Sequence, residues 1–207
     1  MDYKNFISRI FISLVFISIY SICLFINFSL VFYLIITIYF LVILEIFIYF
    51  RKYKLIPITY ILFSFFFMLN INFKEEYLSI FNLFVLLVVT FDIFSYLVGK
   101  LYGKKKLIKI SPNKTIEGFF GGLFFSFLTG LLYAYYFELK IDILLIFFII
   151  LIQFTAFIGD ILESSYKRKN NLKDSSEFLP GHGGVFDRFD SFLFSIIFFS
   201  IFIKFYP

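Results

Sequence analysis

The chain has 207 residues, of which 61% are hydrophobic and only 16% are charged, and its mean hydropathy is +0.96. Soluble domains carry about 45–50% apolar and about 25% charged residues, so this composition argues against a water-soluble enzyme, a disordered chain and a nucleic-acid-binding domain. The length fits one membrane domain. The single cysteine, Cys23, excludes a disulfide within one chain.

Seven apolar segments are long enough to cross a bilayer, which takes about 20 helical residues. The first is too long for the core of a signal peptide and has no small-residue cleavage site behind it, so we expect it to stay as a helix. The sequence therefore predicts an all-α, polytopic integral membrane protein with about seven transmembrane helices. These are Phe6–Phe25, Phe28–Phe50, Leu55–Phe73 (interrupted by Pro57, Asn70 and Asn72), Tyr77–Gly99, Thr115–Phe137, Ile141–Leu162 and Asp187–Tyr206.

Basic residues alternate along the connections between these segments. Lysine and arginine gather before the first helix and in the connections near 51–54, 100–114 and 167–173, whereas the connections between them hold few. Because basic residues accumulate on the cytoplasmic side, the N-terminus is predicted to be cytoplasmic and the C-terminus external. We expect a multi-pass protein of the inner (plasma) membrane with its active site facing the cytoplasm. The run 104–106 fits either a topology marker that contacts anionic lipid or a part of the site.

Glycine is confined to one part of the chain. All ten glycines fall between Gly99 and Gly184, and residues 1–87 contain none. We therefore expect one membrane domain over 1–207. Residues 1–87 would be scaffold helices and residues 88–192 a catalytic region, with cytoplasmic connections at 100–114 and 163–186.

Three acidic residues lie inside predicted helices, where a charge costs about 2.5–3.5 kcal/mol and marks a functional candidate. Glu45, Asp92 and Asp160 each lie six to eight residues before the next basic residue, which is roughly 10 Å inside the cytoplasmic boundary. This common depth favours chemistry at the inner surface over transport. Glu45 fits a side chain that snorkels toward Arg51 or Lys52, and Asp92 fits either a structural hydrogen bond or a role beside the site.

Two helix faces carry the acids that point to a metal ion. Asp187 and Asp190 are three residues apart at the start of the last helix, where helix capping would need only one of them. Together with the intramembrane Asp160 they favour a hard cation such as Mg²⁺, which takes oxygen ligands. The face of the preceding helix carries four polar residues at helical spacing: Asp160, Glu163, Ser164 and Lys167.

Two connections are suited to phosphate. Residues 180–184 read Pro-Gly-His-Gly-Gly, and such glycines let backbone N–H groups approach an anion. His182 fits a phosphate contact, a proton role or an ordinary hydrogen bond. In the other connection Thr115 or Asn113 can cap the next helix, whose N-terminus, beside Lys114, offers N–H groups to a phosphate.

Small residues recur every four positions along the helix that follows. This stripe is typical of close helix packing, either within one chain or in a homodimer. It consists of Gly118, Gly122, Ser126 and Gly130.

The segment 164–190 reads Ser-Ser-Tyr-Lys-Arg, then Lys-Asp at 173–174, then Pro-Gly-His-Gly-Gly-Val-Phe-Asp-Arg-Phe-Asp. It closely resembles the diagnostic segment of phosphatidate cytidylyltransferases, also called CDP-diacylglycerol synthases. Residues 92–99 and 111–118 are similar to that family's second conserved block, and residues 159–164 to its metal-binding helix. The resemblance covers about residues 88–192 and implies that typical members are longer at the N-terminal side.

The resemblance implies transfer of CMP from CTP to phosphatidate, which gives CDP-diacylglycerol and pyrophosphate for phospholipid biosynthesis. It implies Mg²⁺ as cofactor, CTP and phosphatidate as substrates, membrane lipids as further partners, and no nucleic acid. Asp160, Asp187 and Asp190 are the expected metal ligands, and Lys167 joins them as a catalytic residue. The expected substrate-binding residues are Ser111, Lys114, Thr115, Ser164, Arg168, Lys173, His182, Gly183, Gly184 and Arg188.

Three other functions are compatible with parts of the sequence. A CTP-dependent lipid-alcohol kinase would share the membrane architecture, and it differs in whether CMP or only a phosphate reaches the lipid. A small transporter or channel is favoured only by the helices, and the one-sided acids argue against it. An inactive homologue conflicts with the complete set of motifs. The number of metal ions and the oligomeric state stay open.

Overall fold

The computed structural model describes residues 3–108, 110–111, 114–179 and 183–206, with side chains from residue 12 onward. This described part contains seven α-helices, one short 3-10 helix and two isolated β-bridges, but no strand. The all-α prediction is confirmed. In chain order the elements are α1 (Tyr3–Ile26), α2 (Leu30–Tyr49), α3 (Leu55–Met68), η1 (Glu75–Tyr77), α4 (Leu78–Tyr102), α5 (Ile116–Tyr136), α6 (Ile143–Lys169) and α7 (Phe186–Phe202).

The largest differences from the predicted boundaries lie at the ends of α3 and α6. Helix α3 ends at Met68 instead of Phe73, because the Asn70 side chain donates a 2.7 Å hydrogen bond to the Phe66 carbonyl and closes the last turn. Helix α6 continues to Lys169, beyond the apolar span predicted to end at Leu162, and so includes the polar face up to Lys167 that the spacing indicated. Its polar end has acids followed by bases at helical spacing, which stabilises a helix in water.

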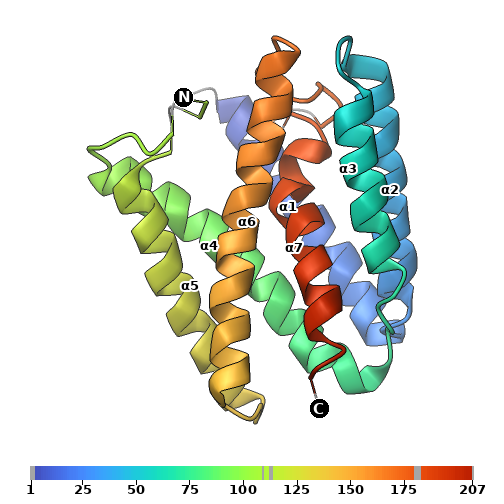
Figure 1. The fold of residues 1–207 in the computed structure, drawn as a ribbon, viewed down its shortest axis with the longest axis vertical. Helices are drawn as coiled ribbons and strands as arrows, with labels where there is room; N and C mark the ends of the chain where they lie inside the picture. Colours follow the sequence, from blue (N-terminus) through green and yellow to red (C-terminus); the bar gives the residue numbers. More distant parts are fainter. Residues whose placement is uncertain (1–2, 109, 112–113, 180–182, 207) are drawn as a thin grey trace. The chain divides into compact units, whose positions relative to one another are not determined.

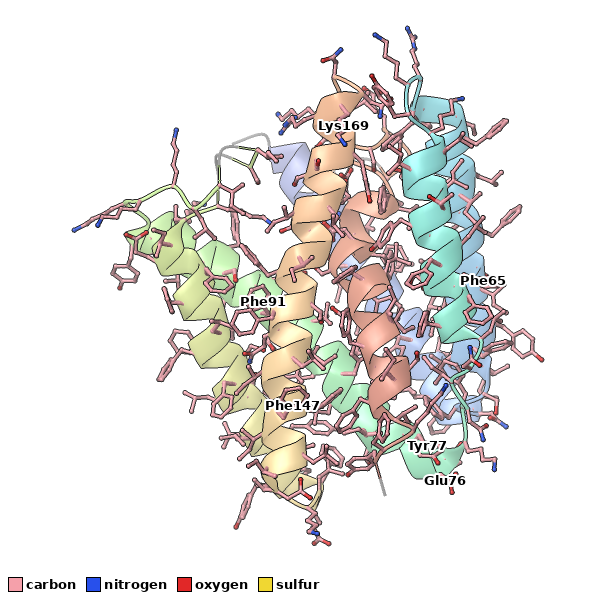
Figure 2. The ribbon with its side chains drawn as sticks, in the orientation of Figure 1. Phe65, Glu76, Tyr77, Phe91, Phe147 and Lys169 are labelled. Atoms are coloured by element: carbon pink, nitrogen blue, oxygen red, sulfur yellow. The ribbon has the colours of Figure 1, made fainter. Side chains whose placement is uncertain are left out.

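Four helical segments are long and apolar enough to cross a membrane, judged by length and composition over the described residues. Their outward side chains include Phe147, which is 58% exposed and points away from the neighbouring helices (Figure 2). Such a surface is that of a membrane protein, whose apolar side chains contact lipid. The four segments are Leu30–Tyr49, Glu75–Tyr102, Ile116–Tyr136 and Ile143–Lys169, and the shorter apolar helices are Ile12–Ile26 and Leu55–Met68.

The chain divides into two compact units. Unit 1 comprises Met1–Leu78 and Tyr166–Phe189, and unit 2 comprises Ser79–Ser165 and Asp190–Pro207. The end of α6 and the start of α7, with the connection between them, therefore belong to the unit that holds α1 to α3. This division follows a different line from the sequence-based one at residue 87.

In unit 1, α2 packs against both α1 and α3 and runs antiparallel to α3 (Figure 1). The Tyr39 hydroxyl of α2 forms a buried 2.5 Å hydrogen bond with Ser64 of α3. At one end of this unit, the Lys52 amide donates a 2.7 Å hydrogen bond to Asn170. The basic connection after α2 therefore lies beside the basic end of α6, as two connections on the same side of a membrane would.

In unit 2, the small-residue stripe of α5 packs against α4. A Cβ atom on Gly118 would lie only 2.6 Å from the Ser95 carbonyl oxygen and 3.0 Å from the Gly99 Cα. Further along, Phe91 of α4 (Figure 2) packs edge-on against Phe119 and Phe157. Of the two uses that the sequence left open for the stripe, the structure shows packing within the chain.

Candidate active site

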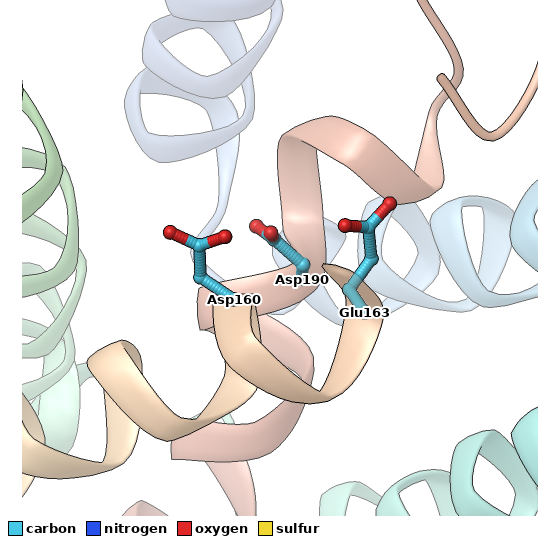
Figure 3. Close-up of side chains that lie close together, drawn as sticks. All are labelled: Asp160, Glu163 and Asp190. Carbon is cyan, nitrogen blue, oxygen red and sulfur yellow. The ribbon is translucent and has the colours of Figure 1, made fainter. Parts of the chain in front are cut away.

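Three carboxyl groups come together in unit 2. Asp160 and Glu163 lie on α6 and Asp190 lies on α7 (Figure 3). One ligand oxygen from each of them lies within 4.8 Å of the other two. Glu163 and Asp190 are buried, whereas the Asp160 side chain is one-third exposed. We name these three residues the acid cluster.

The acid cluster forms because α6 and α7 approach each other at Gly159. A Cβ atom at this position would lie 2.6 Å from the Asp190 carbonyl oxygen and 2.9 Å from the Phe194 Cβ. Any side chain there would therefore push α7 away. The spacing of Asp160 and Glu163, three residues apart, then turns both carboxyl groups toward the same side of α6.

One cation of the chain already faces the acid cluster. The Lys114 ammonium group forms an ion pair with Asp160 and lies 5.1 Å from the centre of the Phe157 ring. Buried carboxylates are costly unless they are paired or coordinate a metal ion. This ion pair balances the charge of one of the three carboxyl groups, and three carboxyl oxygens within 4.8 Å of one another also fit a divalent cation. Oxygen ligands of this kind suit Mg²⁺ or another hard cation.

A fourth acid is connected to the acid cluster through Ser191. The Ser191 amide donates a 2.8 Å hydrogen bond to Asp190, and its hydroxyl donates a 3.2 Å hydrogen bond to Asp92 on α4. Asp92 is thus held next to a cluster residue by a hydrogen bond. This contact fits both roles that the sequence left open for it.

The acid cluster differs in one member from the predicted set of metal ligands. Asp160 and Asp190 are brought together as expected, and Glu163 joins them. The sequence placed Glu163 on the same helix face as Asp160, a signal that was sufficient to nominate it. Asp187 belongs to unit 1, so its role as a metal ligand stays a prediction.

In unit 1, Asp187 is held by several hydrogen bonds. Its Oδ1 atom pairs with the Lys167 ammonium group at 2.6 Å. Its Oδ2 atom accepts hydrogen bonds from the Gly184 amide at 2.8 Å and from the Ser175 amide and hydroxyl, both at 2.9 Å. This set of donors fixes the direction of the carboxylate on the first turn of α7.

The connection before α5 is folded back on the start of that helix. Thr115 is the N-cap, as predicted, and its hydroxyl oxygen accepts a 3.1 Å hydrogen bond from the Gly118 amide. The Ile116 amide donates to the Lys105 carbonyl at 3.0 Å, and the Glu117 carboxylate accepts from the Lys104 amide at 3.1 Å. The amides of residues 116 and 118, which the sequence offered to a phosphate, are therefore already bonded within the chain.

The remaining predicted substrate-binding residues lie in varied settings. Arg168, Lys173 and Arg188 are exposed cations at the polar end of unit 1, and Arg168 donates a 2.8 Å hydrogen bond to the Leu172 carbonyl. Ser164 is buried on α6 and Ser111 is partly buried. The predicted His182 lies outside the described residues. Gly183 has a φ of +80°, a conformation that glycine adopts without strain.

Comparison with known proteins identifies the family. The model of the cytidylyltransferase family matches residues 6–206, nearly the whole chain. The chain belongs to this family. The resemblance seen in the sequence is thereby confirmed, and the acid cluster and the Asp187 network lie within the matched residues.

Three phosphatidate cytidylyltransferases illustrate the similarity. That of Staphylococcus epidermidis is 48% identical over 115 residues, which are 54% of this chain and 44% of the relative. That of Staphylococcus aureus (strain COL) is 47% identical over 111 residues, or 53% and 43% of the two chains. That of Staphylococcus haemolyticus is 46% identical over 105 residues, or 50% and 40%. The matched part spans less than half the length of each relative.

Proposed function

We propose that this protein transfers CMP from CTP to phosphatidate, giving CDP-diacylglycerol and pyrophosphate, at the cytoplasmic face of the plasma membrane. The observation that carries the proposal is the acid cluster in a chain of the cytidylyltransferase family. The relatives named phosphatidate cytidylyltransferase supply the choice of substrates. The apolar outer surface supports a lipid substrate, because a lipid reaches such a site from the bilayer.

The reaction joins two polyanions, so the main task of the chain is to balance negative charge. A phosphate oxygen of phosphatidate attacks the α-phosphorus of CTP, a new P–O bond forms, and the bond to the bridging oxygen of the β-phosphate breaks. Pyrophosphate leaves with that electron pair. No covalent bond to the protein is needed.

The residues of the acid cluster would hold Mg²⁺, which would neutralise charge on the reacting phosphates. Among the chain's own groups, Lys114 offers an ammonium group beside Asp160, and Lys167 offers one beside Asp187. The exposed Arg168, Lys173 and Arg188 are suited to attract the triphosphate. Lysine and arginine bind phosphate by charge-assisted hydrogen bonds, which are the stronger kind.

The proposal is tested with the full chain in detergent or in vesicles that contain phosphatidate, with Mg²⁺ present. CTP labelled at the α-phosphate and CTP labelled at the γ-phosphate are supplied in separate reactions, and the lipid is then extracted. We expect α-label in the lipid and no γ-label. Label from the γ-phosphate alone would instead establish a lipid kinase. Recovery of neither label would refute the proposal.

Asp160→Asn is the matched variant for this assay. It removes a carboxylate from the acid cluster and keeps the size of the side chain. We expect it to accumulate in the membrane like the natural chain and to transfer no α-label. If Asp160→Asn transferred CMP at the natural rate, the acid cluster would not be needed for the activity.

A further inference from the structure

Glu45 of α2 lies far from any predicted site residue in the sequence, yet the structure gives it a defined task. The side chain is buried, with 4% of its surface exposed. It does not snorkel toward Arg51 or Lys52, as the sequence suggested. Its carboxylate instead faces the backbone at the start of α7, within unit 1.

The contact consists of two hydrogen bonds to a single oxygen atom. Glu45 Oε2 accepts from the Val185 amide at 2.7 Å and from the Phe186 amide at 3.2 Å. The first N–H groups of a helix have no acceptor inside that helix. Because both amides are buried, Glu45 satisfies donors that would otherwise be left without water or a partner.

Gly184 brings Glu45 close to this turn. A Cβ atom on Gly184 would collide with both the Glu45 carboxylate and the Ser175 hydroxyl. The two side chains thus enclose the backbone from α2 and from the α6–α7 connection. The turn formed by residues 183–186 is held by contacts on either side.

The same turn carries one donor of Asp187, the Gly184 amide, and Ser175 in the α6–α7 connection supplies the others. The Asp187 Oδ2 atom accepts from the amides of Gly184 and Ser175, while the amides of Val185 and Phe186 go to Glu45. The two carboxylates therefore divide the free amides of the turn between them. This division leaves Asp187 Oδ1 directed at Lys167, 2.6 Å away.

We propose that Glu45 is a positioning residue for cytidylyl transfer, which fixes the 183–186 turn and thereby the direction of the Asp187 carboxylate. The inference rests on the proposed function. Without Glu45, the amides of residues 185 and 186 lose their acceptor. Asp187 is the carboxylate on the same turn and would be drawn to those amides and away from Lys167.

The test combines a structural and a kinetic measurement on the full chain. Hydrogen exchange is followed for the amides of Val185 and Phe186, and kcat and KM for CTP are measured with α-labelled CTP. In the natural chain both amides should exchange slowly. Glu45→Ala should expose both to exchange and lower kcat by about 10–100-fold, the usual loss for an outer-shell partner. KM for CTP should change much less, because Glu45 touches no substrate.

Glu45→Gln separates the loss of an acceptor from the loss of the fold. The amide oxygen of glutamine can still accept both hydrogen bonds, although a neutral acceptor is weaker than a charged one. Exchange and kcat should both fall between those of the natural chain and those of Glu45→Ala. If Glu45→Ala does not accumulate, Glu45→Gln decides: natural exchange rates at both amides would overturn the proposal.

Tyr39→Phe is the matched control, since it removes another buried hydrogen bond of α2, the one to Ser64. It should lower thermal stability and leave exchange at residues 185 and 186 unchanged, with kcat near the natural value. A loss of kcat in Tyr39→Phe equal to that in Glu45→Ala would show that Glu45 only stabilises the fold. Natural kcat in Glu45→Ala despite fast exchange would also overturn the proposal. If the natural chain transfers no label, it is the proposed function that fails, and the exchange data still test the contact.

Discussion

At the residue scale, Glu163 gives the sharpest test of the acid cluster, because it was not among the predicted metal ligands and the structure places its carboxyl group beside those of Asp160 and Asp190. Glu163→Gln keeps the shape of the side chain and removes its charge. We expect CMP transfer to fall at least about a hundredfold, as for loss of a charged metal ligand. The rate of α-label incorporation into lipid, measured against Mg²⁺ concentration, checks this expectation.

Asp142→Asn is the matched control for Glu163→Gln in the same unit. Asp142 caps α6 by accepting a 2.9 Å hydrogen bond from the Leu145 amide, and asparagine caps equally well. Transfer should therefore stay close to the natural rate. If both variants lose activity to the same degree, the loss depends on the total negative charge of unit 2 and not on the acid cluster.

Single residues were predictable where the local sequence carries the signal. Asp160 and Asp190 stand out because an acid inside an apolar helix, or paired at a helix start, has a physical cost that needs a reason. Glu45 carries the same cost, but its partners are 140 residues further along the chain. Periodicity shows which face of a helix a residue occupies, and it does not show which distant backbone that face meets.

At the element scale, the packing of α5 on α4 predicts that the glycines of the small-residue stripe differ in how well they tolerate substitution by alanine. A Cβ on Gly118 would meet the backbone of Ser95 at 2.6 Å, whereas one on Gly130 would meet side chains alone, the end of Leu87 at 2.8 Å and Ile149 at 3.5 Å. Gly118→Ala should lower the free energy of unfolding by about 1–3 kcal/mol, because backbone cannot move aside.

Gly130→Ala serves as the control, since the Leu87 side chain can rotate and alanine favours a helix by about 1 kcal/mol over glycine. We expect it to be neutral or slightly stabilising. Thermal unfolding in detergent, with both variants beside the natural chain, makes the comparison. Equal stability of the two variants would contradict the contact between α4 and α5.

Helices were more predictable than their ends. An apolar run of about 20 residues has few alternatives to a helix in a bilayer, so all seven were expected. The ends depend on side chains that bond to the backbone, such as Asn70 at the end of α3 and Thr115 at the start of α5. Thr115 was foreseen because capping residues are few and recognisable. The extension of α6 beyond the apolar span was foreseen as far as Lys167, because Asp160, Glu163, Ser164 and Lys167 recur at helical spacing, and only the exact end at Lys169 was not.

At the scale of the whole molecule, the alternation of basic connections predicts which side of the membrane each connection faces. In a Cys23→Ser background, Lys105→Cys and Lys140→Cys place one thiol at either end of α5, and both positions are exposed. A membrane-impermeant thiol reagent should label Lys140→Cys on intact cells and Lys105→Cys only after permeabilisation. The reverse pattern would invert the proposed topology and its cytoplasmic site.

The ion pair between Lys114 and Asp160 predicts that folding does not depend on a bound cation. Part of the charge of the acid cluster is balanced by the chain itself. Purification with a chelator should therefore leave the thermal unfolding temperature nearly unchanged and abolish CMP transfer. Added Mg²⁺ should restore transfer. Unfolding on chelation would show that the cation is a structural component.

The division into two units could not be predicted from the order of the residues. Glycine content separated residues 1–87 from the rest, whereas unit 1 also takes up Tyr166–Phe189. Its hydrogen bonds explain this: Asn170 bonds to Lys52, and the amides of residues 185 and 186 bond to Glu45. A polar connection packs on the elements that accept or donate hydrogen bonds to it. Amino-acid composition does not show which elements these are.

The close contact at Gly159 bears on which ion the protein selects. The carboxyl groups of the acid cluster are attached to α6 and α7, whose backbones are in contact at Gly159. The distance between these two helices therefore sets the space between the carboxyl groups. Mg²⁺ binds oxygen at about 2.0–2.1 Å and Ca²⁺ at about 2.3–2.6 Å. A methyl group from Gly159→Ala would wedge the helices apart and should shift the preference toward the larger ion, which thermal stabilisation by Mg²⁺ and by Ca²⁺ would reveal. The choice of Mg²⁺ over Ca²⁺ would then depend on the absence of a Cβ atom at residue 159.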